Sequence, residues 1–169
     1  MRKLTILKTI IDFLWILSLM TLPFIILLIG ITLFNNSLIG KYNLRIYGLH
    51  IEEFTSTTKS LLILPMIAYM LVIYCIYLFR NVIKKFNELN VFNSSVIQNM
   101  NKIGITLIII AFLNTIPSMI YKEIKHGSFE FGFGTSPFLI TLILGLFFMV
   151  LSEIFKIAKT AKEENELTI

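Results

Sequence analysis

Two carboxylates inside apolar segments are the first residues of this sequence that could do chemistry. Asp12 and Glu153 each lie within about one helical turn of the end of an apolar run. A charge in lipid is costly, so such residues either mark a proton or ion pathway or pair with a counter-ion. Neither lies near the middle of its run. We therefore interpret both as structural polar groups, paired with Lys8, Lys156 or a neighbouring loop, rather than as a proton relay.

Asn114 lies deeper in its apolar run, three residues before Pro117. Proline lacks an N–H group and leaves a carbonyl one turn back without its donor. An asparagine amide can satisfy that carbonyl or bond to an adjacent helix, so we interpret Asn114 as a third structural polar group, with a ligand contact as the alternative. Pro23 and Pro65 lie in the same outer part of their runs. Bends there could open a cavity to the outside, although proline is common in transmembrane helices.

The residue types that hold metals or drive catalysis are sparse. His50 and His126 lie in different loops, and the single cysteine, Cys75, is deep in an apolar run. Two histidines without a third ligand are a weak sign of a metal site. No phosphate-binding loop, zinc-protease, serine-hydrolase or dinucleotide motif occurs. We therefore expect no enzymatic activity, no bound metal and no cofactor.

The composition places the chain in a lipid bilayer. Hydrophobic residues make up 56% of the 169 residues and charged residues 15%, whereas soluble domains carry about 25% charged residues. The net charge is +5, but the basic residues flank the apolar runs, where anionic lipid headgroups attract them. We expect no direct contact with nucleic acid, because no basic helix stands clear of the membrane.

Four apolar runs are long enough to cross the hydrocarbon core, which takes about 20 residues of helix. They are Ile10–Phe34, Leu61–Phe79, Ile103–Tyr121 and Pro137–Phe155. Ten lysines and arginines lie on the side of the two termini, against five on the other side, and such a bias marks the cytoplasmic side. The sequence predicts an all-α membrane protein of four transmembrane helices, a single domain with both termini in the cytoplasm.

The two outer loops carry a strand-like pattern. Polar and apolar residues alternate over Gly40–Gly48 and again over 128–133, which is typical of half-buried strands. Single strands are unstable alone, so we predict that the two loops pair into a small β cap outside the membrane.

The segments on the inner side look helical. Apolar spacing continues from the second run to Phe86, and Asn93 or Ser94 can cap a further helix, so residues 80–102 are predicted to form a helical hairpin. Residues 156–169 form a cytoplasmic tail that contains an acidic run. No internal repeat divides the chain.

Several segments resemble a known family. They are the end of the last run with Glu153-Ile154-Phe155, the tail 162–169, the middle loop with Asn90-Val91-Phe92-Asn93-Ser94, and Asn101-Lys102-Ile103-Gly104. Together they resemble the YoaS-like family of small bacterial membrane proteins, domain of unknown function 2975, although Glu166 stands where aspartate is common. The resemblance implies four spans over the whole chain and no established activity. It also implies a partner, because genes of this family often adjoin one for a small Xre- or Cro-type helix-turn-helix regulator.

We therefore interpret the chain as a non-enzymatic regulator in the bacterial cytoplasmic membrane that binds or sequesters such a transcription factor. The candidate contact residues lie in the middle loop and the tail: Val91, Phe92, Glu163, Glu164, Glu166, Leu167 and Ile169. The acidic tail would complement the basic DNA-binding face of the regulator. Alternatively, Leu167 and Ile169 fold back onto Val91 and Phe92.

Two further functions stay open at this point. One is a bacteriocin-immunity or envelope-stress protein that acts at the outer face. The other is a small transporter or channel, which the lack of midplane charge and of broken helix pairs disfavours.

Overall fold

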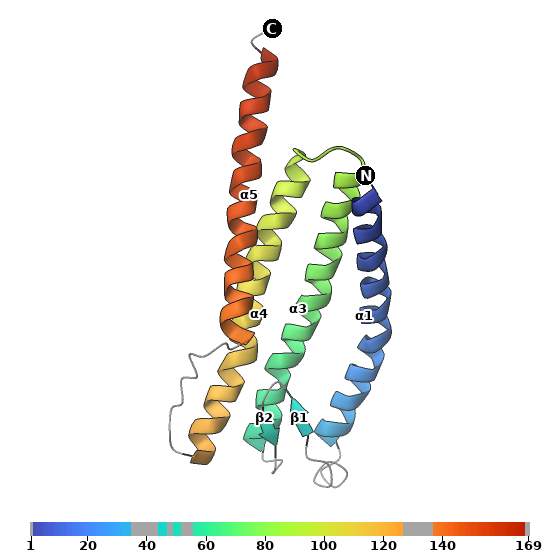
Figure 1. Cartoon of the computed structure of the whole chain (residues 1–169). Helices are drawn as coiled ribbons and strands as arrows, with labels where there is room; N and C mark the ends of the chain where they lie inside the picture. Colours follow the sequence, from blue (N-terminus) through green and yellow to red (C-terminus); the bar gives the residue numbers. More distant parts are fainter. Residues whose placement is uncertain (1, 35–43, 47–48, 52–55, 127–136, 168–169) are drawn as a thin grey trace.

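A computed structural model of the whole chain describes residues 2–34, 44–46, 49–51, 56–126 and 137–167 (Figure 1). Four long helices dominate it: α1 (Arg2–Phe34), α3 (Ser56–Asn87), α4 (Ser94–His126) and α5 (Pro137–Leu167). All four are long and apolar enough to cross a membrane. A helix is suited to lipid because it satisfies its backbone polar groups internally. The four predicted spans are therefore confirmed as helices.

The helices form a row, in which each packs mainly on the next along the chain. α1 packs on α3, α3 on α4, and α4 on α5. α1 begins and α5 ends at one end of this bundle, which we call the tail end, and the short strands lie at the opposite end (Figure 1). The fold thus places the start of α1 and the end of α5 at the same end of the bundle.

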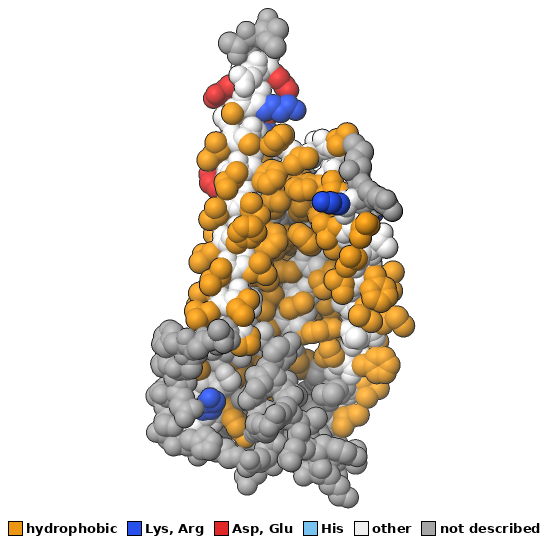
Figure 2. Space-filling model, in the orientation of Figure 1, with side chains coloured by type: hydrophobic (Ala, Val, Ile, Leu, Met, Phe, Trp, Pro, Cys, Tyr) orange, Lys and Arg blue, Asp and Glu red, His pale blue; other side chains and the backbone are white. Residues whose placement is uncertain are grey.

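The packed core lies between α3 and α4, with α5 covering part of it. Its buried members are Ala68, Cys75, Leu78, Val82, Val96, Met100, Ile103 and Ile110. α1 and α5, at the two edges of the row, expose large apolar side chains over most of their length, as the space-filling view shows (Figure 2). Such a surface is stable only against hydrocarbon, so the bundle is built for lipid contact on its outer helices.

Two short strands in the segment between α1 and α3 pair with each other. β1 (Leu44–Ile46) pairs antiparallel with β2 (Leu49–Ile51), with Arg45 opposite His50. Only residues 47 and 48 separate the strands in sequence, which is the shortest common hairpin connection. Of the predicted strand at 40–48, residues 44–46 are a strand, and they pair with residues 49–51. The second strand of the predicted cap, residues 128–133, lies outside the described residues.

α4 and α5 come into close backbone contact at a pair of glycines. A Cβ atom on Gly104 would lie 2.7 Å from the carbonyl oxygen of Gly145, and a Cβ on Gly145 would lie 2.8 Å from the carbonyl oxygen of Gly104. Near this crossing the buried Ser152 hydroxyl donates to the carbonyl of Ile97 across the interface (2.8 Å). Small residues permit this approach, which replaces side-chain packing with direct backbone contact.

α5 is displaced along α4 toward the tail end. Phe138, in the first turn of α5, packs edge-on against Phe112 (5.4 Å between ring centroids), although α4 continues to His126. At the other end Lys159 reaches Ser94, the first residue of α4 (2.7 Å). Residues 160–167, which we call the α5 extension, therefore project past the end of α4 (Figure 1).

A Schellman motif ends α3 and turns the chain toward α4. The amide of Asn90 donates to the carbonyl of Lys85 and the amide of Leu89 to that of Phe86, both at 3.1 Å. Leu89 takes the left-handed position of this motif, with φ 57°, and its side chain is 70% exposed. Glycine is the usual residue there, because a Cβ atom in that conformation clashes with the backbone.

Leu89→Gly is therefore expected to stabilise the protein by about 1 kcal/mol. The matched variant Leu89→Ala removes the same exposed side chain but keeps the Cβ atom, so it should gain much less. Thermal unfolding in mild detergent compares the two variants. Equal midpoints for both would contradict a backbone origin of the effect.

Candidate functional site

A series of polar and aromatic contacts joins α1 to α3 along their interface, which we call the α1–α3 seam. Going toward the tail end, the Thr21 hydroxyl bonds to the Tyr69 hydroxyl, and Trp15 lies against Tyr77 (5.6 Å between ring centroids). The contact of this series that lies nearest the tail end is an ion pair between Asp12 on α1 and Arg80 on α3.

In that ion pair the Arg80 Nε donates to the Asp12 Oδ1 at 2.5 Å, with side chains 43% and 31% exposed. Asp12 thus has a counter-ion on another helix, but this partner is not one of the lysines that we considered. The sequence pointed to Arg80 only as one of the basic residues that set the orientation. To predict this pair one must know how far α1 is shifted along α3, which a single sequence does not provide.

Glu153 is paired with Lys156, one of the partners that the sequence suggested, but the pair is exposed. It pairs with Lys156 one turn along α5 (3.3 Å), and both side chains are 64% exposed. An exposed pair of this kind contributes less than about 1 kcal/mol. Glu153 therefore does not anchor the end of the last span through a buried partner.

Asn114 is half-buried on α4, and its Oδ1 is buried without a hydrogen-bond partner among the described residues. The neighbouring hydroxyls of Thr115 and Ser118 bond to carbonyls of their own helix, those of Ala111 and Thr115. Pro117 is fully buried, whereas Pro23 is exposed. The predicted hydrogen bond from Asn114 to another helix is therefore not made by this oxygen.

The middle loop begins with the turn after α3 and ends at the cap of α4. The Asn93 Oδ1 accepts the backbone N–H of Ser95 (2.8 Å), so the predicted cap is Asn93. Val91 is half-buried, and the ring of Phe92 lies 6.1 Å from that of Phe155 on α5 while remaining 39% exposed. Phe92 thus joins the loop to α5 and still presents an edge outward.

The tail is a helix and not a folded-back strand of chain. α5 runs without a break to Leu167, whose side chain is 88% exposed. The expectation that Leu167 covers Val91 and Phe92 is therefore wrong, because the helical extension carries it away from the loop. Ile169 lies outside the described residues.

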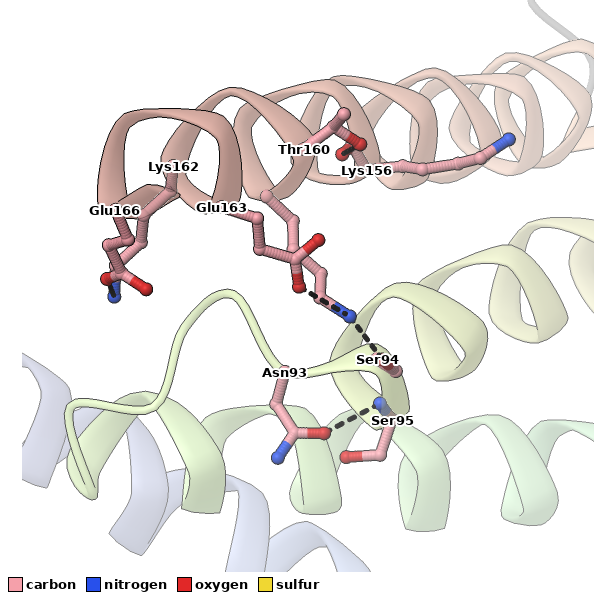
Figure 3. A network of polar contacts seen from close by, with 9 residues as sticks. Asn93, Ser94, Ser95, Lys156, Thr160, Lys162, Glu163 and Glu166 are labelled. Atoms are coloured by element: carbon pink, nitrogen blue, oxygen red, sulfur yellow. Dashed lines mark hydrogen bonds and ion pairs between the residues drawn. The ribbon is translucent and has the colours of Figure 1, made fainter. Parts of the chain in front are cut away.

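Lysines offset the acidic residues of the tail along the helix (Figure 3). Glu163 pairs with Lys159 (3.5 Å) and Glu166 with Lys162 (3.6 Å), each one turn apart. Glu164 is exposed. The residues 156–167 carry three lysines and three glutamates, so this end of α5 is a polar, zwitterionic surface rather than an acidic one.

The histidines and the cysteine belong to three different elements. His50 lies on β2 and His126 ends α4, while Cys75 is buried between α3 and α4. In the described part of the chain, no group of three histidine, cysteine or acidic residues is placed to hold a metal ion.

Comparison with known proteins gives a family but no function. Residues 44–169 match the family described as "Protein of unknown function (DUF2975)". This stretch contains the β-hairpin, α3, α4 and α5, and thus every segment that carried the resemblance in the sequence. No curated protein and no solved structure matches the chain. Because the match covers well over half of the chain, the protein belongs to the DUF2975 family.

Proposed function

We propose that this integral membrane protein is a non-enzymatic regulator that holds a small helix-turn-helix transcription factor at the cytoplasmic face of a bacterial inner membrane. The observation that carries the proposal is the α5 extension. It is an unbroken continuation of a membrane helix, it projects past α4, and every one of its residues is exposed. A helix that projects in this way buries nothing of its own protein, which favours a role in contact with a partner.

The surface offered to the partner combines the α5 extension with the middle loop. Leu167, Leu89 and the edge of Phe92 are exposed apolar groups outside the apolar runs. Apolar anchors surrounded by polar residues are typical of protein interfaces. Glu163, Glu164 and Glu166 supply carboxylates, two of them bonded to lysines one turn back. A basic partner would compete with these lysines, so charge sets orientation and rate more than affinity.

The orientation in the membrane rests on the distribution of charge. Ten of the fifteen basic residues belong to the tail end and its loop, five to the hairpin end, and such asymmetry directs the richer side to the cytoplasm. Both termini then lie in the cytoplasm, where a transcription factor is found. A reporter that is active only in the cytoplasm, fused after Ile169, checks this orientation.

Deleting residues 162–169 is expected to abolish binding of a small Xre- or Cro-type helix-turn-helix regulator while leaving thermal stability unchanged. The deletion spares the contact of Lys159 with Ser94, so the packing of α5 on α4 is retained. Replacing Glu163, Glu164 and Glu166 with lysine should also weaken binding. Wild-type binding should fall as salt rises, because exposed charges are screened over about 8–10 Å near physiological ionic strength.

Binding is measured with the purified regulator and the full-length protein in lipid nanodiscs. The matched control replaces Glu153 and Lys156 with glutamine, which removes an exposed ion pair outside the α5 extension, and should leave binding unchanged. The proposal is overturned if the truncated protein binds the regulator as wild type does, or if wild type in the nanodiscs does not bind it at low salt.

A further inference from the structure

The register of the α1–α3 seam extends beyond its last ion pair. Trp15 meets Tyr77, and one turn nearer the tail end Asp12 meets Arg80. One further turn along each antiparallel helix leads to Lys8 on α1 and Lys84 on α3, since residues four apart share a helix face. The next position after the ion pair is therefore occupied by two cations that face the same seam.

The acidic residues near these two lysines are already engaged. Asp12 bonds to Arg80, and Glu88 bonds to Lys85 at 2.9 Å. Among the described residues, neither Lys8 nor Lys84 forms an ion pair or a hydrogen bond, and both are exposed. Two like charges at one position destabilise the seam unless an anion lies between them.

The pKa of Glu88 supports the closeness of these cations. It is lowered, first by the hydrogen bond from Lys85 and then by the charges of Lys85, Lys84 and Lys8. The field of Lys8 thus reaches the end of α3, as the register requires.

An unpartnered donor lies on the same face of α3. Asn87 is three residues after Lys84 and seven after Arg80, so all three share the side turned to α1. Its Nδ2 is buried and has no acceptor among the described residues. A buried amide N–H without an acceptor costs about 1–3 kcal/mol, and an anion bound by the lysines would supply one.

We propose that the tail end of the α1–α3 seam is a phosphate-binding site, formed by Lys8, Lys84 and the side-chain amide of Asn87. A phosphate group carries both the negative charge and the acceptor oxygens that these three donors lack. A lipid headgroup and a soluble phosphate share this chemistry. The site lies about 6 Å, one helical turn, beyond Asp12 and Arg80, at the depth of the headgroup layer that flanks the hydrocarbon core.

The test measures thermal stability of the full-length protein in nanodiscs of phosphatidylcholine alone and with added phosphatidylglycerol. The phosphate of phosphatidylcholine is offset by its own choline cation, whereas the phosphatidylglycerol headgroup keeps a net negative charge for the two lysines. Phosphatidylglycerol should raise the midpoint of wild type. The double variant Lys8→Gln/Lys84→Gln should bind it about thirtyfold more weakly, because two basic contacts to an anionic headgroup are lost. In phosphatidylcholine alone this variant should be at least as stable as wild type, since it removes a like-charge repulsion.

Two further measurements are needed. The first distinguishes a specific site from general attraction between basic residues and anionic lipid, and the second distinguishes a lipid headgroup from a soluble phosphate. The matched control Lys156→Gln/Lys162→Gln removes the same charge from α5 and should keep the phosphatidylglycerol effect. Inorganic phosphate at constant ionic strength should neither reproduce that effect nor compete with it. If it does both, the site takes a soluble phosphate and the lipid is excluded as its source.

The proposal is overturned if phosphatidylglycerol and phosphatidylcholine stabilise wild type equally, or if both double variants lose the effect to the same extent. Lys84→Glu gives a second check that keeps the fold. It places an acid opposite Lys8, so it should raise stability in phosphatidylcholine and abolish the response to phosphatidylglycerol. A retained response in this variant would also overturn the phosphate site.

Discussion

Gly104→Ala is expected to destabilise the bundle by about 1–3 kcal/mol, the usual cost of inserting a methyl group into close packing. The new Cβ atom would lie 2.5 Å from the Met149 Cγ and 2.7 Å from the carbonyl oxygen of Gly145. The methionine side chain can move, but the carbonyl belongs to the backbone of α5. The two helices must therefore separate, which also weakens the hydrogen bond from Ser152 to Ile97.

The chain offers a matched control in Gly30, where a Cβ atom would meet nothing within 4 Å. Gly30→Ala should leave stability unchanged or raise it slightly. In thermal unfolding, the midpoint of Gly104→Ala should fall by about 2–12 °C, and Gly145→Ala should fall similarly, because its Cβ atom would also meet a backbone oxygen. Equal midpoints for Gly104→Ala and Gly30→Ala would show that α4 and α5 do not cross at these glycines.

Arg80→Gln is expected to loosen α1 from α3. Asp12 would keep its charge at the edge of the apolar layer without its only ion-pair partner in the described chain. The pair is partly exposed, so the cost should lie between those of exposed and buried pairs, about 1–2 kcal/mol. Since α1 packs mainly on α3, this loss falls on the main interface that holds the helix.

The single tryptophan, Trp15, lies in that interface and reports on it directly. Brominated lipids should quench its fluorescence more strongly in Arg80→Gln than in wild type, because lipid gains access to the seam. Exchanging the two charges, Asp12→Arg with Arg80→Asp, should restore the wild-type quenching and stability. Lys156→Gln, which breaks the exposed pair with Glu153, should change neither. If the exchanged pair does not restore quenching and stability, the effect of Arg80→Gln does not come from the loss of the ion pair.

The sequence was sufficient for the spans because lipid imposes their length and polarity. Ile10, Leu61, Ile103 and Pro137 begin runs that all lie inside helices of the structure. The helical ends outside the runs followed from capping chemistry, as at Asn93. These features depend only on residues that are close in sequence, so periodicity and local donors identify them.

The contacts between helices were not accessible in the same way. The pairing of Asp12 with Arg80 and the crossing of Gly104 with Gly145 depend on how far one helix is shifted along another. Hydropathy is nearly the same at every shift, since all four helices are apolar. For the same reason the exposure of Glu153 could not be foreseen, because it depends on which face of α5 turns toward α4.

The row of helices also has a consequence for how the protein is made. Each main interface joins α1 to α3, α3 to α4, or α4 to α5, so it can be completed as soon as the later helix of the pair enters the bilayer. No helix must wait for a distant segment, which favours rapid assembly. The tight glycine crossing forms last, after the ribosome has passed Gly145. A chain released before that point would leave the surface around Gly104 uncovered, a defect that a membrane protease could recognise.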